Sequence, residues 1–219
     1  TYPDIKDEII MSTCVKNEDN YIIQWIEYHS KLGIQKFIVY DNANNNVQNC
    51  FVPSKDQGSN LPTVLEKYIQ NGMVILFHWP YTQTFQQTQQ NHSLYAFRSA
   101  KYIGLLDVDE YVNPQMGITS LPELFSLLTD QCGTKIGGFE LKCKNFNNPS
   151  DLPTDGYNFL KIFDCDPIIT TCNKIFVVPE NVKTFSVHMI TNGLPSVMLS
   201  EKIIFFNHYI FLNKVSRGR

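Results

Sequence analysis

Hydrophobic positions in the first half of the chain alternate between short apolar runs and stretches with helical spacing. The apolar runs predict strands over residues 8–15, 36–40, 73–79 and 102–112. Apolar positions at helical spacing predict intervening helices over residues 19–32, 61–70 and 83–100, the first capped by Asp19 or Asn20. Strands that alternate with helices in this way indicate parallel pairing through right-handed crossovers.

The pattern changes after residue 113. One short helix is expected over residues 121–129, and β-rich segments follow at residues 138–143, 157–163, 173–178, 185–190 and 203–209. Prolines in the connections favour mixed or antiparallel pairing here. No repeat or linker divides the chain, so we predict one domain over residues 1–219. It combines a parallel half (1–113) and a β-rich half (114–219) in one mixed α/β sheet flanked by helices.

Composition narrows the function classes. The 219 residues are 43% hydrophobic and 18% charged, and the formal net charge is −3, which gives no basic footprint for nucleic acid. No apolar run approaches the roughly 18 residues that span a bilayer, and the N-terminus shows no leader pattern. We therefore expect a soluble protein without a membrane span.

The cysteine pattern indicates a reducing compartment. Six cysteines are scattered without a Cys-x-x-Cys pair, at positions Cys14, Cys50, Cys132, Cys143, Cys165 and Cys172. A chain of this size does not need disulfides for stability. Reduced thiols and a cytoplasmic location are expected, although a pair among the last three stays open.

The run from Tyr102 to Val112 ends in three acids, Asp107, Asp109 and Glu110. As a continuous strand it would direct Asp107 and Asp109 to one face and Glu110 to the other. Two carboxylates in one small volume need a cation between them, and dense oxygen ligands suit Mg²⁺ or Mn²⁺. The alternative is a solvated turn, which often follows a strand with acids.

Three segments together resemble a glycosyltransferase family. They are Lys16-Asn17-Glu18, Gln24-Trp25-Ile26-Glu27-Tyr28-His29 and Asp107-Val108-Asp109-Glu110-Tyr111. Their order and spacing resemble the GT-A fold, family-2-like nucleotide-sugar glycosyltransferases of the Asp-x-Asp type. The first half of the chain, to about Val112, matches the family pattern well, and the second half matches it only in short segments. Helical spacing favours core packing for Trp25, Tyr28 and His29.

The resemblance implies a Rossmann-like sheet and a set of donor-binding residues. The strand ends would hold the nucleoside, and basic residues would meet the diphosphate. The donor-binding candidates are Thr13, Val15, Asn17, Glu18, Asp41, Arg98, Asp107, Lys174 and Lys214. Ordinary alternatives remain open: a turn for Asp41, a helix-start acid for Glu18, surface charges for Arg98 and Lys174, and a frayed tail for Lys214.

The resemblance also implies a metal site. Its ligand candidates are Asp107, Asp109, His208 and His188. We favour His208 over His188 because of its place in the segment Asn207-His208-Tyr209, and a structural role is the alternative for either histidine.

The implied reaction is metal-dependent transfer of a sugar, with Mn²⁺ or Mg²⁺, from a UDP-sugar to a hydroxyl of a glycan or glycoprotein. An inverting route needs a base, and the candidates are Glu140, Asp155, Asp164 and Asp166. After Phe139 the chain departs from the family pattern at residues 145–150, which puts the base and the acceptor pocket in doubt. A sugar-nucleotide-forming nucleotidyltransferase and a non-catalytic carbohydrate-binding domain are the alternatives.

Overall fold

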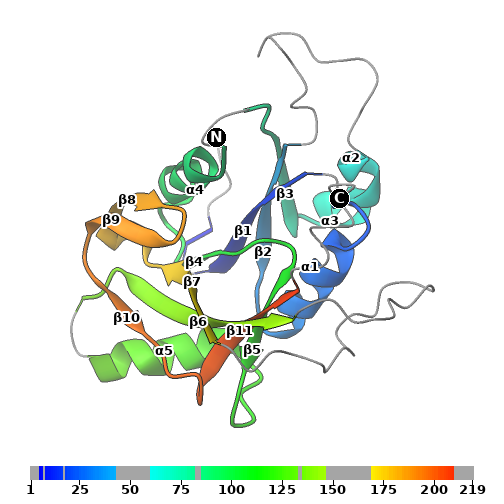
Figure 1. Ribbon diagram of the computed structural model, residues 1–219. Coiled ribbons are helices and arrows are strands. Elements are labelled where there is room, and N and C mark those ends of the chain that lie inside the picture. The colour runs from blue at the N-terminus through cyan, green and yellow to red at the C-terminus, as the bar shows by residue number, and fades with distance from the viewer. Residues whose placement is uncertain are drawn as a thin grey trace.

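The computed structural model describes residues 5–6, 8–16, 18–42, 60–81, 85–132, 135–146 and 169–209. Within them, nine strands form one mixed sheet with helices on both faces (Figure 1). The strand order is β3-β2-β1-β4-β7-β6-β11-β5, and β10 pairs with β6. A separate hairpin, β8-β9, lies beside helix α4. This confirms the predicted α/β class.

The first half forms the parallel part of the sheet. Strands β1 (Ile9–Val15), β2 (Lys36–Asp41), β3 (Val74–His78) and β4 (Tyr102–Leu105) all run in one direction. Their connections contain helices α1 (Ile22–Lys31), α2 (Leu61–Val64), α3 (Glu66–Gln70) and α4 (Phe85–Ala96). Because the strands are parallel, their carboxyl ends lie at one edge of the sheet.

The second half makes the sheet mixed, as its sequence pattern predicted. Helix α5 (Leu121–Cys132) leads to β6 (Gly138–Phe146), and β7 (Ile169–Val177) runs antiparallel between β4 and β6. Strand β11 (Ile204–Tyr209) pairs with β6 and with β5 (Glu110–Pro114). The remaining elements are a 3₁₀ turn, η2 (Pro179–Asn181), and strands β8 (Val182–Ser186), β9 (Met189–Gly193) and β10 (Ser196–Met198).

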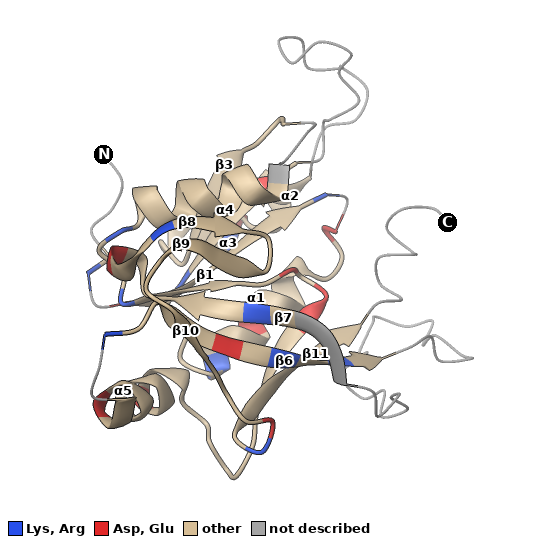
Figure 2. Ribbon diagram, turned by 60° about the vertical axis from the view of Figure 1, so that its left-hand side comes forward, with Lys and Arg blue, Asp and Glu red and all other residues tan. Residues whose placement is uncertain are grey.

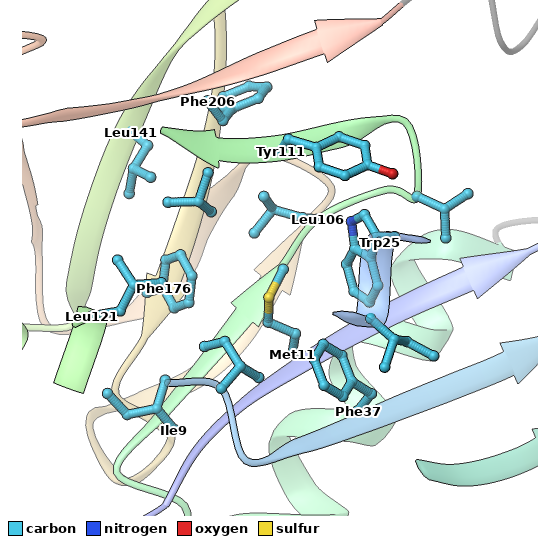
Figure 3. Close-up of a cluster of buried hydrophobic side chains, with 14 of the residues drawn as sticks. Ile9, Met11, Trp25, Phe37, Leu106, Tyr111, Leu121, Leu141, Phe176 and Phe206 are labelled. Atoms are coloured by element: carbon cyan, nitrogen blue, oxygen red, sulfur yellow. The ribbon is translucent and has the colours of Figure 1, made fainter. Parts of the chain in front are cut away.

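Two apolar cores lie on opposite faces of the sheet. The larger one packs α1 and α5 against the strands, with Trp25 beside Tyr111 and Phe176 near the centre (Figure 3). Gly104 on β4 is required there, since a Cβ atom would lie 2.5 Å from the Phe176 ring. The smaller core joins α4 and β8 to the other face.

Helix α4 also serves as a hydrogen-bonding partner for the edge of β8. The Asn91 side chain donates to Phe185 O at 2.8 Å and accepts from Phe185 N at 2.9 Å. Tyr95 donates to Lys183 O, and Arg98 donates to the carbonyls of Val182 and Glu180. These bonds satisfy backbone groups that an edge strand would otherwise expose.

Two strand predictions and one cap prediction were wrong. Residues 102–112 are two strands separated by a turn, because the chain leaves the extended conformation after Leu105. Residues 185–190 span the end of β8, the β8-β9 turn and the start of β9 rather than one strand. Phe185 and Ile190 are apolar because both pack in the smaller core. Helix α1 begins after Tyr21 rather than at Asp19 or Asn20, and it has no side-chain cap. The predicted strand 157–163 lies outside the described residues.

None of the helices in the described part of the chain is long and apolar enough to cross a bilayer. Cys14 and Cys143 are free thiols, so Cys143 forms no disulfide. The cytoplasmic location stays a prediction.

Replacing Asn91 with alanine should lower the free energy of unfolding by about 1–3 kcal/mol, since it leaves two backbone groups of β8 without partners. Urea unfolding at neutral pH measures the change. Gln87→Ala, at an exposed position of the same helix, is the matched control and should stay within about 0.5 kcal/mol. An equal effect of both substitutions would contradict the edge-capping role.

Candidate functional site

The candidate site is built around the acidic turn, residues 107–110, between β4 and β5. Glu110 N donates to Asp107 O at 3.1 Å, and Asp107 N donates to the Glu110 carboxylate at 2.8 Å. The turn interrupts the alternation of side chains along a strand. The prediction that Glu110 points away from the other two acids was therefore wrong. Its carboxylate lies within the same cluster as that of Asp109.

Lys174 of β7 holds the acidic turn together. Its Nζ lies 2.8 Å from Asp107 Oδ2 and 3.0 Å from Glu110 Oε2, and its side chain is 2% exposed. Burial disfavours the charged ammonium, but the two carboxylates outweigh this and raise the pKa of Lys174. The ammonium therefore faces the two acids rather than solvent, which fits a positioning role better than direct contact with a diphosphate.

The three acids experience different surroundings. Burial raises the pKa of Glu110 to about 7, against the opposing effect of Lys174. Burial also favours neutral Asp107, but the Lys174 charge outweighs it and lowers the pKa. The Asp107 side chain is still 40% exposed and accepts a hydrogen bond from Gln86 at 3.1 Å. Asp107 is thus the acid of the turn that is open to a ligand and still held in place.

Asp109, Glu110 and His208 could hold a metal ion. One potential ligand atom from each residue lies within 4.8 Å of the other two. His208 Nε2 lies 3.3 Å from Asp109 Oδ2. Burial lowers the pKa of His208, but its hydrogen bonds to Asp109 and Cys143 outweigh this and raise it well above the usual range. Carboxylate and neutral imidazole donors suit Mn²⁺ and related ions, so the residues present fit such a cation, which would displace the proton of His208 on binding.

Side chains of helix α1 form hydrogen bonds with the backbone of β5 along the edge where β5 has no neighbouring strand. The sequence analysis assigned these side chains to the core. Trp25 Nε1 donates to Glu110 O at 2.9 Å, and the Tyr28 hydroxyl donates to Val112 O at 2.8 Å. Val112 N donates to His29 Nε2 at 3.2 Å, which leaves the proton of the ring on Nδ1, facing Trp25 O. Burial lowers the pKa of His29 to about 3, so it is neutral at physiological pH.

The ends of β1 and β2 carry most of the predicted nucleoside-binding residues. Thr13 and Val15 are buried on β1, and Asp41 is buried at the end of β2. The Thr13 hydroxyl finds no hydrogen-bond partner in the described part of the chain. Burial raises the pKa of the Cys14 thiol, and Asp107, Glu18 and Asp41 raise it further. Acids from three segments therefore converge here on one strand end.

The second predicted histidine, His188, also lies near Asp107. His188, in the β8-β9 turn, has its Nδ1 atom 3.3 Å from Asn173 O. Gln90 of α4 donates to the neighbouring Val187 O at 3.3 Å, which ties this turn to α4. Burial and the Lys174 charge lower the pKa of His188. The structure places His188 near Asp107 and Lys174, whereas His208 pairs with Asp109.

Arg98 is not part of this cluster. It follows α4 and precedes β4, whereas the acidic turn follows β4, so the two lie at opposite ends of the strand. Its guanidinium binds the carbonyls of Val182 and Glu180 and lines a separate cavity of about 560 Å³. The structure therefore does not bring Arg98 together with the other predicted donor-binding residues. Asn17, Lys214, Asp155, Asp164 and Asp166 lie outside the described residues.

Two residues of this region escaped the sequence analysis. Gln86 binds Asp107 from the first turn of α4, and Cys143 of β6 contacts His208. The start of α4 follows β3, so a polar residue there could have been placed at the same edge of the sheet. Nothing in the sequence pattern distinguishes Cys143 from a buried structural cysteine.

Comparison with known proteins shows which family this site belongs to. The family model described as "Glycosyltransferase family 92" matches residues 10–217. The chain belongs to glycosyltransferase family 92. A family 92 protein of Ricinus communis is 22% identical over 92% of this chain, and one of Arabidopsis thaliana is 23% identical over 94%. The chain spans only 35% of the length of each. This membership agrees with the resemblance to a glycosyltransferase family that the three sequence segments indicated.

Solved structures give only distant likenesses. The apo structure of the bifunctional enzyme WbbM covers 64% of this chain and 23% of its own, at 13% identity and a TM-score of 0.34. An apo UDP-glucose pyrophosphorylase covers 93% and 90% of the two chains, at 7% identity and a TM-score of 0.39. These scores are too low to support an argument about function.

Replacing Lys174 with methionine should lower the free energy of unfolding by about 3–5 kcal/mol, because two carboxylates lose their buried counter-charge. Urea unfolding measures the loss. Adding Glu110→Gln to this variant should recover part of it, since one uncompensated acid is removed. Lys183→Met, at an exposed lysine of β8, is the matched control. A Lys174→Met loss as small as that of the control would refute the neutralising role.

The unfolded chain binds a proton on His29 near pH 6.5, whereas the folded protein binds it only near pH 3. Stability from neutral His29 is therefore complete above about pH 6.5 and lost as the pH falls. We expect His29→Gln to remove up to about 1.4 kcal/mol per pH unit from the slope of unfolding free energy between pH 6 and 4. Urea titrations at several pH values measure it, with exposed His78→Gln as control. Equal slopes in wild type and His29→Gln would contradict this assignment.

Proposed function

We propose that this chain is the catalytic domain of a metal-dependent glycosyltransferase of the GT-A, Asp-x-Asp type, as its resemblance to the family-2-like enzymes also suggests. The donor is a UDP-sugar, the acceptor is a hydroxyl of a glycan or glycoprotein, and the reaction inverts the sugar configuration. The observation that carries the proposal is the cluster of Asp109, Glu110 and His208 at the carboxyl edge of the sheet, in a chain of family 92.

The metal ligands in this proposal are Asp109 and His208. Glu110 lies close enough to contribute, but its carboxylate already binds Lys174 and the backbone of the turn. A bound Mn²⁺ or Mg²⁺ would stabilise the negative charge that develops on the departing diphosphate. Glu18 after β1, Asp41 at the end of β2 and Asp107 of the turn make this edge negative, and a bound cation would favour the approach of a diphosphate.

The chain's own residues orient the donor. The buried Thr13 hydroxyl and Asp41 offer hydrogen-bonding groups to the nucleoside at the ends of β1 and β2. Asp107 is held by Lys174 and Gln86 and remains 40% exposed, which allows it to meet the ribose or the metal. Val15, Glu18, Asn17 and Lys214 complete the proposed donor site, and His188 is the second candidate metal ligand.

Asp109→Asn should reduce metal-dependent hydrolysis of the nucleotide sugar on the order of 100-fold or more, because it removes a ligand of the charge-stabilising cation. A panel of nucleotide sugars with Mn²⁺, followed by release of the nucleoside diphosphate, measures the rate. Asp130→Asn, an exposed acid on α5, is the matched control. The melting temperature should stay within a few degrees in both variants. Full activity of Asp109→Asn would refute the metal-site proposal.

A further inference from the structure

A polar groove lies on the face of β7 opposite to the acidic turn. It has a volume of about 520 Å³, and β9, β10 and Glu140 of β6 form its walls. Adjacent residues of β7 connect it to the site, because successive side chains of a strand face opposite sides. Lys174 binds the acidic turn, whereas the Asn173 amide donates to Glu140 Oε2 at 3.3 Å.

At β6 this face of the sheet is only partly covered. Strand β6 alternates between buried apolar residues such as Phe139 and Leu141 and half-buried charged residues, Glu140 and Lys142. Figure 2 shows these charged residues along β6, beside β7 and the β8-β9 hairpin. Strand β9 is mostly exposed, and the Met189 residue at its start is 59% exposed. The groove is thus a surface that a large ligand can reach.

The chemistry of the lining suits a neutral, hydroxyl-rich ligand. Its polar side chains are those of Glu140, Thr191, Asn192 and Ser196, and none of its described lining residues is basic. Carboxylate, amide and hydroxyl groups can all bond sugar hydroxyls, and Met189 adds apolar surface for the C–H face of a sugar ring. A phosphorylated ligand would instead require cations.

Glu140 is the central polar group of the groove. Ser196 Oγ donates to its Oε1 atom, and Asn173 donates to its Oε2 atom, so both oxygens are oriented. A carboxylate has about four acceptor sites, so further positions remain for ligand hydroxyls. The His188 ring, next to Met189 of the groove, contacts the backbone of Asn173 and lies near Asp107. His188 therefore lies between the Met189 end of the groove and the candidate donor site.

We propose that this groove binds the glycan acceptor, with Glu140 and Asn192 hydrogen-bonding its hydroxyls; this rests on the proposed transferase function. The donor and acceptor would then occupy the two faces of β7 at one end of the strand. Lys174 supports the donor side, and Asn173 orients Glu140 on the acceptor side.

A glycan microarray, probed with the whole chain in the presence of UDP and Mn²⁺, tests the assignment. Glu140→Gln should weaken binding to the glycans recognised by the wild type about tenfold, since a charged acceptor is replaced by a neutral one. Glu66→Gln, an exposed acid on α3, is the matched control and should bind like the wild type. Asn192→Ala, at an exposed position of β9, tests the groove independently should Glu140→Gln fold poorly.

Hydrolysis of the nucleotide sugar separates this inference from the proposed function. Asn192→Ala should hydrolyse the donor within about twofold of the wild-type rate, because this residue of the acceptor groove takes no part in transfer to water. Unchanged glycan binding in both variants, or no glycan binding by a wild type that hydrolyses the donor, would overturn the acceptor assignment. Absence of hydrolysis with every nucleotide sugar would overturn the proposed function instead.

Discussion

The buried ion pair between Lys174 and the acidic turn is the interaction on which the site depends. Asp107, Asp109 and Glu110 lie in one tight turn, where like charges repel strongly at low solvent exposure. Lys174 comes from a strand 67 residues beyond Asp107 and neutralises two of the three acids. The acidic turn is therefore stable only when β7 has folded into the sheet between β4 and β6.

Helices α1 and α4 each supply hydrogen-bond partners for the unpaired backbone groups of a strand edge. Helix α1 satisfies the free edge of β5 through Trp25, Tyr28 and His29. Helix α4 satisfies β8 through Asn91 and Tyr95, and Arg98 just after the helix adds a bond to Val182 O. In both cases side chains replace the neighbouring strand that the edge lacks. This explains why an otherwise buried segment of α1 carries polar atoms and why α4 is rich in amides.

The side chains on the two faces of β7 make contacts with chemically different groups. On one face Lys174 neutralises Asp107 and Glu110, while Asp109 pairs with His208. On the other face Asn173 connects to Glu140 and the groove beside β9. In the proposed reaction two substrates must meet at one point, and a single strand with chemically different faces would bring them together within a short distance.

The sequence by itself determined the α/β class, the parallel first half and the position of the acids, because apolar periodicity and strand ends are local properties. It also indicated that Trp25, Tyr28 and His29 pack in the core, where Trp25 and His29 are buried and Tyr28 is partly buried, and that the chain resembles a glycosyltransferase family. It could not show that the apolar run breaks at Asp107, since both strands are apolar. Only the tertiary structure brought Lys174 and His208 to that turn and took Arg98 to the opposite end of β4, because such pairings depend on strand order rather than on neighbouring residues.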